Sequence, residues 1–339
     1  MKKVFIHVLK FSIPLGLGIL LIWYIYKDLS AEDKNHIANA FRNANYWWIL
    51  LSVFIGVLSH ISRAYRWLIL LNHMGYQSRL SNSFFSVMIG YIANLAFPRL
   101  GEVSRCAVMG KYEKIPFEKL FGTVLAERII DMIMLFLITL FTILFQLTLL
   151  GNFLNEEVII PLQAKFAGDN SGISLKTIVI LSLAGLIIIA FFLLKSKMKN
   201  IYTKVREMML GFAEGLRTVF SIKRKGAFIF HTLLIWALYF LMLYVCFFSL
   251  EETKNVSLWG VLSAFVFGSF GIIAVQGGIG AYPAIVTKTL MLFGIAKTIG
   301  FAFGWIAWTG QFVMILVFGV ISLIFLPITN KQVDQDEQA

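Results

Sequence analysis

The sequence is poor in charged residues. Asp, Glu, Lys and Arg make up 14% of its 339 residues, against about 25% in an average soluble domain. Hydrophobic residues make up 59% of the chain, and a soluble fold of this size could not bury so much apolar surface. The composition therefore excludes a soluble globular protein and predicts a polytopic membrane protein.

Motifs for metal or nucleotide chemistry are also missing. The two cysteines, Cys106 and Cys246, are too few for a disulfide framework or a cysteine metal cluster. The five histidines are scattered without HExxH spacing, and no GxxxxGK[ST] phosphate loop occurs. We therefore expect no metal, no cofactor and no nucleotide hydrolysis.

Long apolar runs dominate the chain instead. About 20 helical residues cross a hydrocarbon core of about 30 Å, and a helix keeps its backbone hydrogen bonds satisfied in lipid. The runs are residues 11–26, 47–62, 124–150, 177–194, 226–249, 258–275 and 298–326. The sequence thus predicts an all-α polytopic membrane protein with about seven to eight membrane helices, of which one or two are re-entrant or broken.

The basic residues mark one side of the membrane. Four segments hold 20 of the 30 Lys and Arg residues, and by the positive-inside rule they are cytoplasmic. They are residues 1–10, 63–80, 98–120 and 195–225. The net charge of +12 is then a topology signal and does not indicate nucleic-acid binding. We expect a multi-pass protein of the cell membrane, the cytoplasmic membrane of a bacterium, with both termini in the cytoplasm.

Two interruptions break the pattern of full crossings. The segment 84–97, FFSVMIGYIANLAF, lies between two cytoplasmic segments, and its 14 residues reach only about 21 Å as a helix. We predict a re-entrant helix that enters from the cytoplasm and ends at Pro98. The second break is VQGGIGAYP at 275–283. Either 258–275 and 282–294 form a hairpin that enters from outside, or this region makes full crossings.

We predict one integral membrane domain, residues 1–330, followed by a polar tail at 331–339. The opposite orientations of the two interruptions suggest inverted halves, 47–150 and 226–326, and paired broken segments are typical of a transporter's substrate site. The connector 195–225 has apolar residues at helical spacing and nine basic residues. It predicts an amphipathic helix that lies on the inner leaflet or packs on the cytoplasmic face of the protein.

Charged residues within the apolar runs are the first candidate binding residues. A charge at the centre of a membrane helix costs at least about 2.5–3.5 kcal/mol, so it normally faces a cavity or a partner. Glu127, Arg128 and Asp131 lie in one run, and the two carboxylates share a helix face. Their natural partners are arginines that start from the same side of the membrane. These are Arg63, Arg66, Arg99 and Arg105.

The arginine motifs also have simpler interpretations. Arg63 and Arg66, three apart on one helix face, suit bidentate phosphate recognition, or they extend to the interface as anchors. In FPRLGEVSR, Arg99, Glu102 and Arg105 either line a headgroup cavity at the mouth of the re-entrant helix or form a local ion pair. Both interpretations remain open for each motif.

The glycine-rich break is the last candidate. Half-helix N-termini present free N–H groups and a positive dipole end, which suits an anion, and Lys288 could counter a phosphate. The alternative is close helix packing through small residues. The residues of the break are Gln276, Gly277, Gly278, Gly280 and Tyr282.

The motifs SRAYRW, FPRLGEVSR, LAERIID and GGIGAYP follow one another in this order. The order resembles that of the flippase-like membrane domain of lysylphosphatidylglycerol synthases and its stand-alone relatives, over roughly residues 10–327. Relatives often have a proline before the glycine pair and an acidic residue after it, where this chain has Gln276 and Tyr282-Pro283. The resemblance implies lipid translocation by a stand-alone member without the soluble synthase domain.

The leading prediction is a transporter, not an enzyme, that moves a lipid or lipid-linked anionic molecule between leaflets. The candidate residues would bind this membrane substrate, none would be catalytic, and the oligomeric state is not predicted. Without a nucleotide motif, the energy must come from an ion gradient, a partner or the lipid's own gradient. The alternatives are a membrane-embedded transferase that uses Glu127 or Asp131 as a base or metal ligand, and a non-transporting scaffold of an envelope complex.

Overall fold

The computed structural model of the protein describes residues 30–97, 100–146 and 224–336, together with Lys27, Ile160 and Ile222. The chain divides into two compact units, residues 1–142 with 219–339, and residues 143–218. The expected runs 11–26 and 177–194 and most of the connector 195–225 lie outside the described residues. The helices that follow belong to the first unit, apart from residues 143–145.

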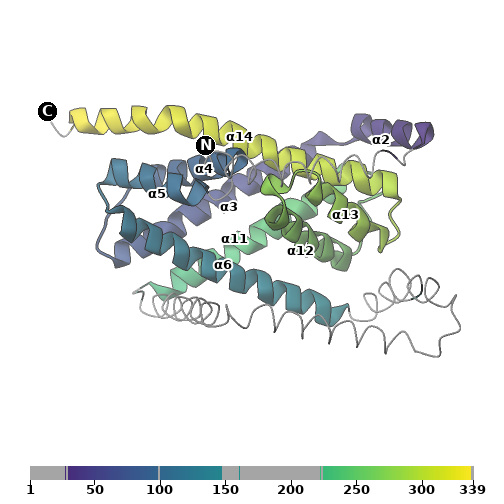
Figure 1. The fold of residues 1–339 in the computed structure, drawn as a ribbon, viewed down its shortest axis with the longest axis horizontal. Coiled ribbons are helices and arrows are strands. Elements are labelled where there is room, and N and C mark those ends of the chain that lie inside the picture. Colours follow the sequence, from purple (N-terminus) through teal and green to yellow (C-terminus); the bar gives the residue numbers. More distant parts are fainter. Residues whose placement is uncertain are drawn as a thin grey trace, which may run out of the picture. The chain divides into compact units, whose positions relative to one another are not determined.

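Every regular element among the described residues is helical (Figure 1). The first group is α2 (Ala31–Asn43), α3 (Tyr46–His73), α4 (Leu80–Ala96), α5 (Leu100–Glu113) and α6 (Phe117–Phe145). The second is α11 (Lys225–Cys246), η2 (Phe247–Ser249), α12 (Leu258–Ala274), η3 (Gln276–Gly278), α13 (Ala281–Met291) and α14 (Lys297–Asp336). Four of these stretches, α3, α6, α11 with η2, and α14, are long and apolar enough to cross a membrane. The all-α polytopic prediction is confirmed.

The helices α4 and α5 form a hairpin of two short helices. With 17 and 14 residues they reach only about 26 Å and 21 Å. They approach closely because two glycines face each other: a Cβ on Gly101 would overlap the carbonyl oxygen of Gly90. Near the tip, Asn94 Oδ1 accepts the Gly101 N–H at 2.7 Å, which satisfies an amide that the first helical turn leaves free. The expected short helix at 84–97 is present within α4, apart from Phe97, and its re-entrant path stays a prediction. Most of the expected cytoplasmic segment 98–120 is helical, as α5.

A second hairpin consists of α12 and α13. The 11 residues of α13 reach only about 16 Å, so the structure has the hairpin rather than full crossings. The two helices touch where Gly268 and Gly271 face Tyr282. The turn between them requires glycine, because three of its residues have positive φ angles of 64°, 71° and 72°. These residues are Gly277, Gly278 and Gly280.

The tips of the two hairpins meet. The turn η3 packs against α4, and a Cβ on Gly277 would lie 3.6 Å from Leu95 Cδ2. From α14, Trp308 Nε1 donates a hydrogen bond of 2.7 Å to the Gly277 carbonyl oxygen. The two hairpins are predicted to enter the membrane from opposite sides. A contact between their tips is what two inverted halves would produce. The inverted halves themselves remain a prediction.

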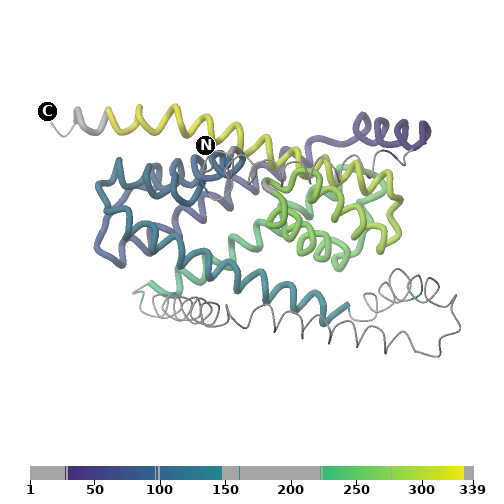
Figure 2. Tube along the Cα trace, viewed as in Figure 1, coloured from purple at the N-terminus to yellow at the C-terminus, as the bar shows by residue number. Residues whose placement is uncertain are grey.

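The long helix α14 lies along both hairpins (Figure 2). It packs against both α13 and α4, and its end is tied to α4 by hydrogen bonds between Asn330 and Asn82. Since α14 continues to Asp336, the expected polar tail 331–339 begins as helix. Beyond Asp131, α6 exposes large apolar side chains such as Phe136, which fits a surface that faces lipid.

Candidate functional site

Five charged side chains are buried together between α3, α5 and α6. Their residues expose between 0% and 9% of their surface, although none lies at the end of a helix. They are Arg63, Arg66, Arg105, Glu127 and Asp131. Charges are buried in this way only when partners compensate for the lost hydration. We call these five residues the charge network.

Each carboxylate of the charge network bridges two arginines. Asp131 contacts Arg63 Nη1 at 2.8 Å and Arg66 Nη2 at 2.9 Å. Glu127 contacts Arg66 Nε at 3.3 Å and Arg105 Nη2 at 2.8 Å. Arg63 and Arg66 lie three residues apart on α3, and Glu127 and Asp131 lie four apart on α6, so each pair presents both groups on one helix face. The expected pairing is confirmed, and the interpretation of Arg63 and Arg66 as interfacial anchors is wrong because both are buried and paired.

Aromatic and hydroxyl side chains complete the surroundings of the arginines. The guanidinium of Arg105 lies 3.8 Å from the ring centroid of Trp67, a distance typical of cation–π contact. Arg66 Nη1 donates to Thr232 on α11 at 3.2 Å. Arg63 Nε donates to the hydroxyl of Tyr239 on α11 at 3.3 Å. These contacts hold the planes of the three guanidinium groups in fixed directions.

The charge network is not electrically balanced. It holds three arginines and two carboxylates, which leaves one positive charge in excess. The nearest further ion pair, Arg128 Nη2 to Glu102 Oε1 at 2.7 Å, is neutral as a pair. An uncompensated positive charge away from water favours an anion. The excess therefore gives this region the chemistry of an anion site.

A narrow cleft reaches the charge network from the α4–α5 hairpin. The room that it leaves is small, about 10 Å³, which is enough for about one water molecule, so a headgroup enters only if the cleft widens. Polar residues of its lining are Arg63, Tyr91, Asn94, Glu102, Arg105 and Arg128. The side chains of Arg128 and Glu102 are 41% and 24% exposed, whereas those behind them are buried. The rim pair therefore stands between solvent and the buried arginines.

Two polar atoms beside this cleft have neither a hydrogen-bond partner nor an ion-pair partner among the described residues. They are Nε of Arg105 and Oε2 of Glu102. A buried guanidinium donor without an acceptor is unusual, because each unsatisfied buried group costs about 1–3 kcal/mol. Arg105 is thus the residue of the charge network with a donor left for a ligand. The prediction of a purely local ion pair in FPRLGEVSR is wrong for Glu102 and Arg105, since both pair with α6.

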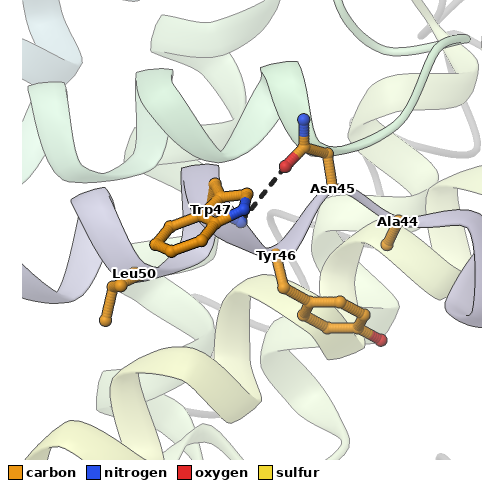
Figure 3. Close-up of a pocket in the computed structure, with 5 residues that line it drawn as sticks. All are labelled: Ala44, Asn45, Tyr46, Trp47 and Leu50. Atoms are coloured by element: carbon orange, nitrogen blue, oxygen red, sulfur yellow. Dashed lines mark hydrogen bonds between the residues drawn. The ribbon is translucent and has the colours of Figure 1, made fainter.

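A wider hollow lies elsewhere, at the start of α3 (Figure 3). It is lined by Ala44, Asn45, Tyr46, Trp47 and Leu50, and Asn45 Oδ1 accepts the Trp47 N–H at 3.2 Å as a helix cap. Tyr46 and Trp47 are 53% and 78% exposed, and no ionisable group other than Tyr46 lines the hollow. Exposed Trp and Tyr at the start of a membrane helix are typical of the lipid–water interface. We do not place the binding site there.

None of the other predicted site residues whose side chains the structure describes belongs to the charge network. Arg99 lies outside the described residues, as does the side chain of Gln276. Gly277, Gly278 and Gly280 form the tip of the second hairpin, where they contact the tip of the first. Tyr282 is buried against α12. Lys288 is exposed near the other end of α13.

Several residues around the site were not predicted from the sequence. Tyr91 on α4 and Tyr239 on α11 have hydroxyl groups 3.4 Å apart and link the cleft to Arg63. His60 lies one turn before Arg63 and is 3% exposed. The helical spacing of His60, Arg63 and Trp67 on α3 was a usable signal, because residues three and four apart share a face. Nothing local distinguishes Tyr239 from other aromatic residues of its span.

No group of three or more His, Cys, Asp and Glu that could hold a metal ion occurs in the part of the chain that the structure describes.

Comparisons with known proteins agree with this architecture. The family described as "Lysylphosphatidylglycerol synthase TM region" matches residues 11–327. UPF0104 membrane protein MJ1595 of Methanocaldococcus jannaschii is 28% identical over 141 residues, which are 41% of this chain and 41% of that protein. The chain thus matches less than half the length of this relative. No solved structure matches the chain. On the family match, which covers nearly the whole sequence, the chain belongs to the lysylphosphatidylglycerol synthase transmembrane-region family.

Proposed function

We propose that this protein moves a lipid or lipid-linked molecule with an anionic headgroup between the leaflets of the membrane. The observation that carries the proposal is the excess positive charge of the charge network beside a cleft that solvent reaches at its rim. A phosphate group in the cleft would balance that charge. The membership in a family of membrane domains is consistent with this role.

Arg105 and Arg128 are the proposed contacts for the headgroup. Arg105 has a free buried donor at Nε, and Arg128 lies at the rim, where its carboxylate partner Glu102 is partly exposed. A phosphate that displaces Glu102 from Arg128 would reach Arg105 next. The acyl chains would remain in the lipid, beside the apolar surface of α6.

The meeting of the two hairpin tips supports a route across the membrane. Short helices that end at middle depth are found where irregular backbone lines a binding cavity. Here the glycine turn at Gly277 touches the tip of α4 near Leu95. If the two hairpin tips separated, a path would open from the cleft to the opposite side of the membrane. The charge distribution supports a cytoplasmic position for the cleft rim and for both termini.

Transport accounts for the charge network better than group transfer does. A general base or a metal ligand needs an available carboxylate lone pair, but Glu127 and Asp131 each bridge two arginines. We infer that these two carboxylates hold the arginines in place. The carboxylates therefore act as positioning residues in this proposal.

The test is a translocation assay on the reconstituted full-length protein. Vesicles contain phosphatidylglycerol with a fluorophore on one acyl chain, and a membrane-impermeant reductant reports how fast the probe leaves the inner leaflet. We expect a faster rate than in protein-free vesicles, and we expect Arg105→Gln to lower the rate by about tenfold or more, because a charged hydrogen bond is lost.

The matched control is Lys111→Gln. This change removes a positive charge from the same helix at an exposed position, so it should leave the rate within about twofold of wild type. Arg105→Lys, which keeps the charge but not the planar donors, should give an intermediate rate. Folded protein that leaves the rate at the protein-free level for a panel of anionic lipids would refute the proposal.

A further inference from the structure

The structure contains a buried histidine that the proposed transport does not yet explain. His60 is 3% exposed and lies near the middle of the 28-residue helix α3. Neither its Nδ1 nor its Nε2 has a hydrogen-bond partner among the described residues. Native proteins rarely leave both ring nitrogens of a buried histidine unpaired, because the lost hydration is not replaced.

The ring of His60 lies directly behind the wall of the cleft. Its centroid is 4.6 Å from that of Tyr91 and 6.3 Å from that of Tyr239. Tyr91 and Arg63 line the cleft. The hydroxyl groups of the two tyrosines are 3.4 Å apart, and that of Tyr239 accepts from Arg63 Nε. A single layer of side chains thus separates His60 from the place proposed for the headgroup.

The described charged and titratable groups around His60 are few. On its own helix the nearest is Arg63, one turn away, and α4 and α11 contribute Tyr91 and Tyr239. The carboxylate of Asp131 on α6 is already paired with two arginines. The helix α14, which also packs against α3, carries charged residues only at its ends. Among the described residues, both carboxylates of the charge network are therefore already paired with arginines, so neither is available to a protonated His60 while the cleft holds no anion.

A second positive charge beside the existing excess is unfavourable in a medium of low dielectric constant, but an anion in the cleft would compensate for it. Proton uptake by His60 and anion binding therefore favour each other, and the coupling is reciprocal by thermodynamic linkage. We propose that His60 is the proton-binding site of the transporter and takes up one proton from water when an anionic headgroup enters the cleft. This inference rests on the proposed function, to which it adds the coupling ion.

The experiment measures headgroup affinity as a function of pH. The full-length protein is placed in phosphatidylcholine nanodiscs, and the probe is acyl-labelled phosphatidylglycerol, whose phosphodiester keeps a single negative charge throughout. Between about pH 5 and pH 8, the range in which histidine titrates, we expect the affinity to rise as the pH falls. Uptake of one proton per lipid corresponds to a change of up to about tenfold per pH unit.

Two variants locate the proton. His60→Gln keeps a polar side chain that cannot become charged, and it should make the affinity independent of pH. His36→Gln, at an exposed position on α2, should keep the wild-type pH profile. A pH indicator dye in weakly buffered solution should report proton uptake by the wild-type protein on lipid addition, so the inference does not depend on whether the His60 variant folds.

The outcomes separate the inference from the proposed function. Binding that does not change with pH in the wild-type protein overturns the inference and leaves the anion site intact. A pH profile that persists in folded His60→Gln protein also overturns it, because another group then takes up the proton. Absence of phosphatidylglycerol binding at every pH overturns both the proposed function and the inference.

Discussion

The change Asp131→Asn tests whether the charge network holds α6 in place. Asn has nearly the shape of Asp, so the change removes the negative charge without leaving a cavity. Arg63 then loses its carboxylate partner, Arg66 keeps only Glu127, which it shares with Arg105, and the excess positive charge of the network rises from one to two. We expect the free energy of unfolding to fall by about 3–5 kcal/mol, the usual cost of removing one partner from a buried ion pair.

The contacts of Asp131 lead to the same magnitude by another route. Asp131 lies within 2.8 Å and 2.9 Å of nitrogens of two arginines. The contact with Arg63 is a charged hydrogen bond, which contributes about 1.5–3 kcal/mol, and the buried ion pair with Arg66 adds to it before Asn recovers part of the bond. The surface of α6 beyond Asp131 is largely exposed, so protein packing there offers little compensation.

The assay is chemical unfolding of the detergent-solubilised protein, followed by tryptophan fluorescence. Glu118→Gln is the matched control, because it removes a carboxylate from an exposed position of the same helix and should change the stability by less than about 0.5 kcal/mol. The double variant Arg63→Gln with Asp131→Asn restores the original excess of one charge. It should be more stable than Asp131→Asn alone, with a coupling of about 0.5–3 kcal/mol. If Asp131→Asn unfolds like the wild type, the charge network is not buried as described.

Two further predictions concern local packing and a helix cap. Gly101→Ala should lower the free energy of unfolding by about 1–3 kcal/mol and reduce the yield of folded protein, because the new Cβ would overlap the carbonyl oxygen of Gly90. The control is Gly122→Ala on α6, where a Cβ would have no atom within 4 Å. This change should be neutral or stabilising by up to about 1 kcal/mol. At the start of α2, the backbone N–H and the hydroxyl of Ser30 both donate to Asp33, which lowers the pKa of that carboxyl below its usual 3.8. The cap should therefore be intact above about pH 4 and be lost as the pH falls through the lowered pKa. The loss should be visible as lower protection of the first-turn amides of α2 against exchange, relative to an unstructured peptide at the same pH; protection that does not change in acid would contradict this reasoning.

The sequence predicted the general features because they depend on residues close together along the chain. The lengths of apolar runs identified the four described helices that are long and apolar enough to cross a membrane, and the shortness of 84–97 identified the short helix α4. The cost of burying a charge also predicted that Glu127 and Asp131 need partners. The arginines that meet this need were among those expected.

The sequence did not reveal how the partners are arranged. The segment 98–120 looked like a basic loop because it contains five Lys and Arg residues, yet Arg105 is buried within α5 and pairs with Glu127. Lys288 was a candidate to counter a bound phosphate, and the structure places it outside the charge network, exposed near the end of α13. A count of charges along the chain cannot tell a topology signal from a buried partner.

Hydrophobicity and helix length both depend on residues that are neighbours in the sequence. The sequence by itself therefore determined that this chain is a polytopic helical membrane protein with interrupted segments. The tertiary structure alone decided that three arginines meet two carboxylates, that Tyr91 and Tyr239 lie between His60 and Arg63, and that the hairpin tips touch. Arg63 and Asp131 are 68 residues apart in the chain but 2.8 Å apart in space. The physical reason is that electrostatic energy depends on distance and burial in three dimensions, which no local pattern encodes.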